Sequence, residues 1–381
     1  ATWKLTGDGR EIQSGKLKLP SLAPRATAEV VLPVKPFNPK PGVEYLVEVS
    51  FQLKQATALL KAGHEIAWDQ FKLPDSAPIT PKTTGKPLVW KSGPGGVTVS
   101  GAGFELTIDQ TNGLASWRSR GTELIRTPLK PSFWRALTDN DRGRQANRSQ
   151  GYWRQAANEL QPQSFKVTDN QGVIEVALGW QLPKAARADW TTTYRIFSNG
   201  EVAVKVDFKP GEANHPAMPR MGMQMSVPAG FEQVTWFGPG PQETYSDRKD
   251  ARVGIYSGTV AEQFYPHYVE PGETGTKVNT RWVAITDQKG AGLLAIGEPL
   301  LSVSALHYET EDLNAAKHPF QLPRRDYTVL NLDLMQQGLG GDDSWGAWPH
   351  KEFQIPCQNY SYQFRLRSLA PGDQPEKVAR Q

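Results

Sequence analysis

The sequence predicts an all-β protein built from antiparallel sandwiches, and three features of the chain support this. Apolar residues alternate with polar ones over short stretches, as they do in a strand that buries one face. Asn-Gly dipeptides separate some of these stretches, where hairpin turns are expected. The 35 glycines and 30 prolines among 381 residues interrupt the chain too often for long helices. Short strands packed face to face are therefore the expected architecture.

Period-two alternation marks the expected strands in order. Residues 44–53 form the first, because every second side chain there is apolar. Residues 104–117 and 189–209 are each expected to form a hairpin, around Asn112-Gly113 and Asn199-Gly200. We expect type I′ turns there, since Asn-Gly tolerates positive φ at both central positions. Further strands are expected at 281–296, 327–334 and 360–366.

One helix is predicted. Residues 311–318 lie between Thr310, a good N-cap, and Pro319, which cannot continue a helix. Acidic side chains cluster at its expected start, where the helix dipole favours negative charge.

A proline-rich stretch at residues 74–87 divides the chain, because four prolines interrupt it and no periodicity is present. The segment before it, residues 1–73, is shorter than the ~100 residues of an immunoglobulin-like sandwich. The segment after it, residues 88–381, contains no second break of this kind. We therefore expect two folded parts joined by a linker.

Composition excludes several classes of protein. Lys and Arg total 43 against 39 Asp and Glu, and the longest basic run is Arg324-Arg325, so nucleic-acid binding is not expected. No stretch approaches the ~18 apolar residues of a membrane span. A lone Cys357 forms no internal disulfide or cysteine zinc cluster, and no spacing typical of a metal site is present.

The most informative stretch is Gly338–Trp345, which combines glycines, two adjacent carboxylates and a tryptophan. Glycine permits positive φ and close approach of other backbone. Asp342 and Asp343 can cap that backbone, which would leave Trp345 as a flat surface on a stiff loop. The alternative is a core position for Trp345, since most indoles are largely buried.

This loop resembles one near the C-terminus of the large bacterial β-galactosidases of glycoside hydrolase family two, and three other segments resemble the same family. Residues 236–248, WFGPGPQETYSDR, match its W-x-G-x-G-P-x-E-x-Y-x-D-R signature. Residues 133–143, FWRALTDNDRG, match F-x-R-A-x-x-D-N-D-x-G. Residues 62–70, AGHEIAWDQ, match A-G-H-x-x-A-W-x-Q. The segments occur in family order, and the resemblance extends to the last expected strand.

The resemblance implies an architecture. Residues 1–73 would be the C-terminal part of an immunoglobulin-like β-sandwich domain that begins upstream of Ala1. Residues 74–87 would be a linker, and residues 88–381 a large antiparallel super-sandwich similar to galactose mutarotase. The catalytic barrel, with its two glutamates and the Mg and Na ions of the family, would lie outside this chain.

The resemblance also implies a function: the chain would be the non-catalytic C-terminal part of a bacterial β-galactosidase. The complete enzyme would hydrolyse terminal β-galactosides such as lactose, in the cytoplasm or the periplasm. Trp345 would stack on the sugar, with Asp342 and Asp343 beside it and the segment after Gly143 as a mobile flap. The chain would carry neither catalytic residues nor metal ligands, so the isolated chain is expected to be inactive. The expected partners are a galactoside, the catalytic barrel and further copies of the protein.

The carboxylates of the chain provide a separate test. A retaining glycosidase needs two carboxyl groups about 5–5.5 Å apart. Asp342 and Asp343 are adjacent, and adjacent residues of an extended chain point to opposite faces. Asp139 and Asp141 lie in a glycine-flanked loop, where acidic side chains usually hydrogen-bond their own backbone. Glu309 and Glu311 lie at a helix start, where the helix dipole favours negative charge. These arguments disfavour the three candidate pairs, Asp342/Asp343, Asp139/Asp141 and Glu309/Glu311.

Two other functions stay open. A mutarotase-like aldose epimerase would use a histidine and a carboxylate, and His307 with Glu309 is one candidate pair without a specific spacing. A stand-alone carbohydrate-binding module would use exposed aromatic residues such as Trp345, Trp348, Tyr152 and Trp153. The sequence upstream of Ala1 would discriminate between these functions.

Overall fold

The computed structural model describes residues 1–74, 86–212 and 215–381. The chain forms two compact units; the first is essentially Ala1–Pro81, and the second contains most of the remainder. Residues 75–85 of the predicted linker lie outside the described residues. The prediction of an all-β protein is confirmed, because antiparallel strands build both units.

The first unit is one four-stranded sheet in the order β2-β1-β3-β4. One face carries the core, with Leu5, Val47 and Val49 buried because alternate residues of β1 and β3 point to the same side. Apolar side chains from the connection between β2 and β3 pack on that face. The strands are β1 (Thr2–Gly7), β2 (Arg10–Lys16), β3 (Tyr45–Gln52) and β4 (Glu65–Lys72).

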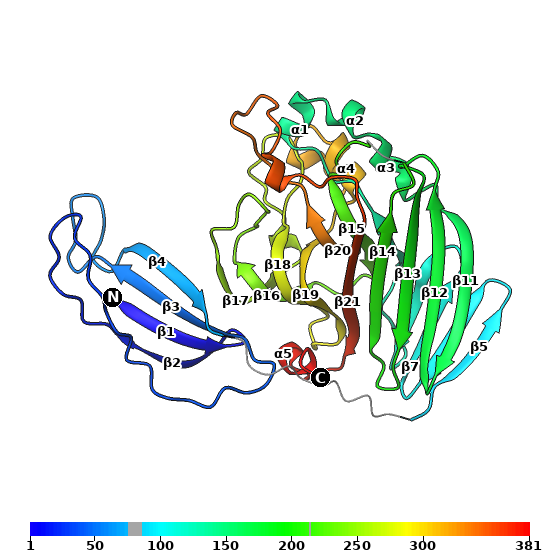
Figure 1. Cartoon of the computed structure of the whole chain (residues 1–381), viewed down its shortest axis with the longest axis horizontal. Coiled ribbons are helices and arrows are strands. Elements are labelled where there is room, and N and C mark those ends of the chain that lie inside the picture. The colour runs from blue at the N-terminus through cyan, green and yellow to red at the C-terminus, as the bar shows by residue number, and fades with distance from the viewer. Residues whose placement is uncertain (75–85, 213–214) are drawn as a thin grey trace. The chain divides into compact units, whose positions relative to one another are not determined.

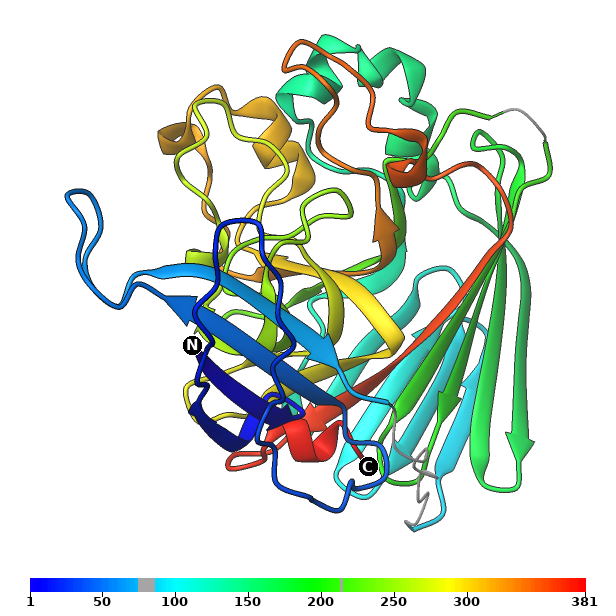
Figure 2. The same ribbon diagram turned by 60° about the vertical axis from the view of Figure 1, so that its left-hand side comes forward.

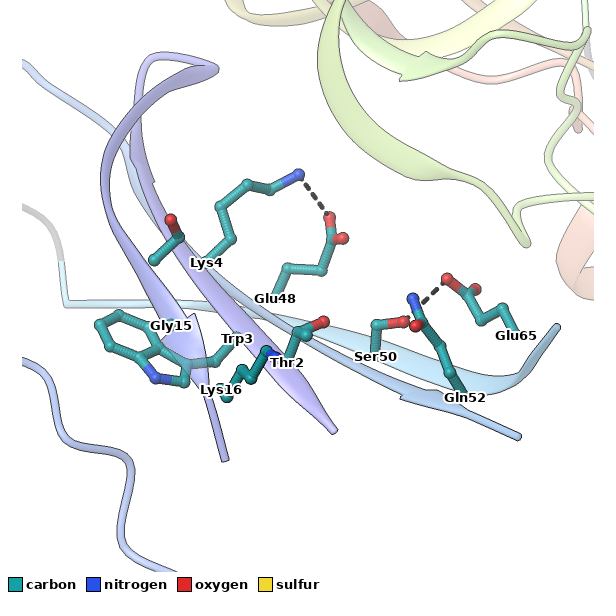
Figure 3. A pocket seen from close by; sticks show the side chains of 10 residues that line it. Thr2, Trp3, Lys4, Gly15, Lys16, Glu48, Ser50, Gln52 and Glu65 are labelled. Atoms are coloured by element: carbon teal, nitrogen blue, oxygen red, sulfur yellow. Dashed lines mark hydrogen bonds and ion pairs between the residues drawn. The ribbon is translucent and has the colours of Figure 1, made fainter. Parts of the chain in front are cut away.

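Polar side chains of this sheet border a shallow groove of about 450 Å³, shown in Figure 3. Lys4 pairs with Glu48 at 3.4 Å, and Ser50 Oγ donates a hydrogen bond of 2.9 Å to Glu65. None of the site residues predicted from the sequence lies here, so the candidate site belongs to the second unit.

The second unit contains most of the strands. They are β5 (Val89–Gly93), β6 (Gly96–Gly101), β7 (Phe104–Asp109), β8 (Gly113–Ser119), β9 (Thr122–Glu123), β10 (Thr127–Ser132), β11 (Gln161–Asn170), β12 (Val173–Leu182), β13 (Ala188–Ile196), β14 (Val202–Lys209), β15 (Arg220–Val227), β16 (Gln233–Gly240), β17 (Arg252–Thr259), β18 (Lys277–Thr286), β19 (Gly292–Leu306), β20 (Thr328–Gln336) and β21 (Tyr360–Leu369).

The long strand β19 joins two halves of this sheet. Its first part pairs with β21 and its last part with β20, while β18 pairs with both parts. From β21 the ladder continues through β14, β13 and β12 to β11, and Figure 2 shows red β21 between the green strands and yellow β19. From β20 it continues through β15, β10 and β8 to the hairpins of β5–β7.

The core lies between these layers and is rich in aromatic residues. Trp190 packs edge-on against Phe133 with ring centroids 5.3 Å apart, and Trp153 and Phe208 complete the cluster. All four are at most 1% exposed. The alternation that predicted the strands contributes to this core, because Trp190 and Phe208 lie on the mainly apolar, buried faces of β13 and β14.

Both predicted hairpins form, but their turns are not type I′. Only the glycine has positive φ in each turn, 75° at Gly113 and 83° at Gly200. Ile196 pairs with Val202, which leaves a connection longer than two residues. The asparagine side chain explains the difference: Asn199 Oδ1 accepts a hydrogen bond from the N–H of Glu201 and organises a wider turn.

The predicted helix is shorter than expected and has a different cap. It is α4, Thr310–Ala315, and its N-cap is Glu309 instead of Thr310. Glu309 and Asp312 form a reciprocal capping box. The carboxylate of Glu309, one residue before the expected cap Thr310, makes this possible. Pro319 begins a separate 3₁₀ turn.

Four helices were not predicted, because each is a single short turn without periodicity. They are α1 (Asp139–Gly143), α2 (Ala146–Ser149), α3 (Tyr152–Ala156) and α5 (Pro375–Val378); the 3₁₀ turns are η1 (Ala261–Gln263), η2 (Pro319–Gln321) and η3 (Lys351–Phe353). The segment after Gly143, expected to be a mobile flap, contains α2 and α3. Figure 1 shows α1–α4 at one end of the second unit. No helix within the described residues is long and apolar enough to span a bilayer.

Candidate functional site

The predicted site residues lie on two segments that meet at one end of the second unit. Asp342, Asp343 and Trp345 belong to the loop after β20, here named the Trp345 loop (residues 337–347), which is orange beside α1 in Figure 1 and Figure 2. Gly143 ends α1. A Cβ built on Gly143 would lie 2.2 Å from the carbonyl oxygen of Trp345, so the two backbones are in direct contact.

Trp345 is 84% exposed, so its indole is not part of the core. Asp343 holds the backbone beneath it: Oδ1 accepts hydrogen bonds from the N–H groups of Trp345 at 2.9 Å and Ala347 at 3.0 Å. These donors lower the pKa of Asp343. Asp342 points away from this turn and binds His350 Nε2 at 2.8 Å, which raises the pKa of His350.

The glycines of the loop serve close packing more than unusual backbone angles. None of Gly338, Gly340 and Gly341 has φ in the left-handed region, contrary to the expectation that they supply positive-φ turns. A Cβ on Gly338 would lie 2.9 Å from Cγ of Asp247, and one on Gly340 would lie 2.6 Å from Arg248 Nη2. The close approach of Asp247 therefore favours glycine at position 338, whereas the flexible Arg248 side chain could move away from a Cβ at position 340.

Charged side chains from outside the Trp345 loop hold its first residues, 337–340, here named the first limb. Asp247 accepts from the N–H of Leu339 with Oδ1 at 3.1 Å and from the N–H of Gly340 with Oδ2 at 2.9 Å. Arg135 donates to the carbonyl oxygens of Gln337 and Gly338. Both anchors lie in segments that resemble family signatures, which explains why those segments carry an acid and an arginine.

The buried ion pair of Arg135 and Asp141 lies beside the rest of the Trp345 loop, residues 341–347, here named the second limb. Two hydrogen bonds of 3.0 Å join them, and both side chains are at most 1% exposed. Burial alone would raise the pKa of Asp141, but the Arg135 guanidinium holds it below the usual range. Asp141 also forms a capping box with Thr138, and Asn140 donates to the carbonyl of Asp343 at 2.9 Å. The turn-forming role expected for Asp141 is confirmed.

A cavity of about 690 Å³ lies beside the loop. Arg142 crosses its wall, where its guanidinium lies 3.4 Å from Asp139 and 3.5 Å from Glu270 and donates to the carbonyl of Pro271. The residues that line the cavity include hydrogen-bond donors, acceptors and the ring of Tyr268. Such a lining suits a hydroxylated ligand, since hydroxyl groups need both kinds of partner.

The three candidate carboxylate pairs are engaged elsewhere. Asp141 pairs with Arg135 and Arg144, and Asp343 caps its own loop. Glu309 accepts from the Tyr327 hydroxyl at 2.8 Å, and Glu311 pairs with Arg154. Each pair therefore has at least one carboxylate with a structural partner.

The histidine considered for an epimerase is also engaged. His307 Nδ1 contacts the carbonyl of Tyr327 at 2.9 Å, and Nε2 contacts Glu232 at 2.8 Å. With both ring nitrogens occupied and 2% exposure, His307 has no free nitrogen for a substrate. Within the described residues, no three His, Cys, Asp or Glu side chains are grouped as metal ligands would be.

Inspection of the sequence did not identify the anchors Arg135, Asn140 and Asp247 as parts of the site. Their only signal was membership of two segments that resemble family signatures. Asp247 and its partner Gly340 are 93 residues apart, and Asn140 and Asp343 are 203 residues apart. Only the fold reveals these pairings.

Comparison with known proteins identifies the family of the chain. The family model described as β-galactosidase small chain matches residues 100–366, and the model for β-galactosidase domain 4 matches residues 1–74. A β-galactosidase from Priestia megaterium is 32% identical over 372 residues, which cover 96% of this chain and 36% of that protein. A β-galactosidase from Vibrio cholerae is also 32% identical, with the same coverage. The chain thus spans about a third of the length of these relatives.

Among solved structures, a galactose 1-epimerase from Lactobacillus acidophilus NCFM aligns with 72% of this chain and 95% of its own, at a TM-score of 0.39 and 7% identity. The family assignment depends on the sequence matches, since the small-chain model alone covers more than half of the residues. The chain belongs to the β-galactosidase small chain family and corresponds to the C-terminal region of these enzymes.

Proposed function

We propose that this chain is the non-catalytic C-terminal part of a β-galactosidase that hydrolyses terminal β-galactosides such as lactose, and that Trp345 contributes one wall of the sugar site. The observation that carries the proposal is an 84% exposed indole on a loop anchored by side chains from two other segments, Arg135 and Asn140 on one and Asp247 on the other. An exposed indole on an anchored loop offers a flat surface on which the C–H face of a sugar can stack.

The catalytic carboxylates belong to another part of the enzyme in this proposal. The structural partners of Asp141, Asp343, Glu309 and Glu311 support it, because a nucleophile or acid catalyst must be free to reach the substrate. The partner is then the catalytic domain of the same protein, whose sugar site would open toward the Trp345 loop.

The test has two parts. The purified 381-residue chain should release no product from a chromogenic galactoside. In the complete enzyme, Trp345→Ala should lower kcat/KM roughly 5- to 150-fold, which corresponds to ~1–3 kcal/mol of stacking on the scale of base–aromatic contacts. Trp345→Phe should retain part of the activity, because a smaller flat ring remains.

Phe320→Ala is the matched control, because Phe320 is 83% exposed but lies on η2, outside the Trp345 loop. It should leave kcat/KM unchanged. Equal losses for Phe320→Ala and Trp345→Ala, or hydrolysis by the isolated chain, would contradict the proposal.

A further inference from the structure

The polar backbone groups at the start of the Trp345 loop are held from two sides. Arg135 donates to the carbonyls of Gln337 and Gly338, and Asp247 accepts from the N–H groups of Leu339 and Gly340. Two charged side chains thus bind backbone groups of four consecutive residues. Without them, these N–H and C=O groups would need water or a neighbouring strand as hydrogen-bond partners.

The two anchors differ in their surroundings. Arg135 is fully buried and neutralises Asp141, so its loss would leave an unpaired buried charge. The Asp247 side chain is 8% exposed, and Arg248, its nearest cation, lies 3.7 Å away with 57% of its side chain exposed. Removing the Asp247 carboxylate therefore disturbs the loop without breaking the buried pair.

The two ends of the Trp345 loop are in direct contact, because a Cβ built on Gly341 would lie 2.5 Å from Cβ of Ala347. Asn140 donates to the carbonyl of Asp343, and Gly143 contacts the backbone of Trp345, whereas Asp247 holds Leu339 and Gly340. Without Asp247, residues 337–340 would keep the Arg135 contacts on their carbonyls and the hydrogen bonds from the N–H groups of Gln337 to Pro219 and of Gly338 to Phe353. The N–H groups of Leu339 and Gly340 would lose their acceptor.

We propose that Asp247 is a positioning residue for the sugar platform: it sets the orientation of Trp345 through the backbone of Leu339 and Gly340 and does not itself touch the sugar. The proposal rests on the proposed function of Trp345 for its effect on activity. Its structural half, that the Asp247 carboxylate holds the loop, is independent of any ligand.

The structural half is tested on the 381-residue chain. Asp247→Asn keeps the shape of the side chain but replaces one acceptor oxygen with an amide donor. Hydrogen bonds to a charged group are strong enough that amide exchange of Leu339 and Gly340 should accelerate at least about tenfold. In protein labelled with 5-fluorotryptophan, the fluorine resonance of Trp345, assigned from its loss in Trp345→Phe, should shift or broaden.

Asp250→Asn is the matched control, since Asp250 is exposed and lies three residues further along the same segment. It should change neither amide exchange nor the Trp345 resonance. If Asp247→Asn also leaves both unchanged, Asp247 does not hold the loop and the inference fails.

The functional half is tested by a double-mutant cycle in the complete enzyme. Asp247→Asn should lower kcat/KM in the parent enzyme but have little further effect when Trp345 is already alanine, because the two residues act as one unit. The melting temperature of the 381-residue chain should change by less than about 2–4 °C, the shift expected per kcal/mol for domains of roughly 150–250 residues. Independent, additive losses would refute positioning through Trp345.

The outcomes separate the inference from the proposed function. If Asp247→Asn frees the loop while Trp345→Ala leaves kcat/KM unchanged, the loop anchor is supported and the sugar role of Trp345 is refuted. If Trp345→Ala lowers kcat/KM and Asp247→Asn changes neither the loop nor the rate, the sugar role is supported and the positioning role is refuted.

Discussion

The interior of the sandwich and the Trp345 loop use the same side chains in opposite ways. Trp190 is fully buried, packs edge-on against Phe133 and donates its indole N–H to Thr192 at 2.8 Å. Trp345 is almost fully exposed, and hydrogen bonds and glycine contacts hold its backbone while the ring remains free. Packing positions the first indole, whereas polar anchors position the second.

Two aspartates show the same contrast. Asp333 is buried in the sheet beside Arg220, with 3.3 Å between its Oδ2 and Arg220 Nε, and burial raises its pKa to about 7. Its Oδ1 has no hydrogen-bond partner among the described residues. Asp343 lies on the surface, and backbone N–H groups lower its pKa. Desolvation therefore determines the direction of the pKa shift of the buried Asp333, and local hydrogen bonding determines that of Asp343 on the loop.

The largest effect should follow removal of a packed indole. Trp190→Ala should lower the free energy of unfolding by ~3–5 kcal/mol, because it leaves a cavity beside Phe133 and Phe208. Urea denaturation monitored by circular dichroism measures this loss. A change below ~1 kcal/mol would mean that the aromatic cluster does not hold the core, and the contrast with the loop would disappear.

A smaller effect should depend on pH through Asp333. Burial raises the pKa of Asp333 in the folded chain to about 7, above the 3.8 of a free aspartate side chain, so the native state binds more protons than the unfolded state between these values. Its contribution to stability is fully present below pH ~4 and is lost as pH rises through ~7. Asp333→Asn cannot titrate, so its stability relative to the parent should rise over this range by an amount on the order of 1–4 kcal/mol.

Urea denaturation of both proteins at pH 4.5 and 7.5 tests this prediction. Asp343→Asn is the control, because the pKa of Asp343 is lowered and should give no such rise between these pH values. Parallel pH profiles for the parent and Asp333→Asn would show that the carboxylate of Asp333 stays ionised throughout.

The smallest effect on stability should come from the exposed indole. Trp345→Ala should change the free energy of unfolding by less than ~0.5 kcal/mol, as expected for a surface residue whose side chain supports nothing else. Differential scanning calorimetry of this variant beside Trp190→Ala makes the comparison direct. A large drop in melting temperature would place Trp345 in the structural core after all.

Much of the fold could be predicted from local patterns. The strands around Tyr45, both hairpins and the strand at 360–366 were recognised because period-two alternation is a local property of the chain. Short helices such as α1 and the wider hairpin turns were missed. They depend on backbone N–H groups that donate to the side chains of Thr138 and Asn199. Four residues of the candidate site were also identified, through glycines, acids and a resemblance.

The sequence by itself determined that the chain is all-β, that it resembles the C-terminal region of a β-galactosidase and that the Trp345 loop is unusual. Only the tertiary structure decided that the indole faces solvent and that Arg135, Asn140 and Asp247 hold the loop. The reason is physical: alternation and signature residues can be read along a chain, but a hydrogen bond between residues 93 or 203 positions apart exists only once packing brings them together.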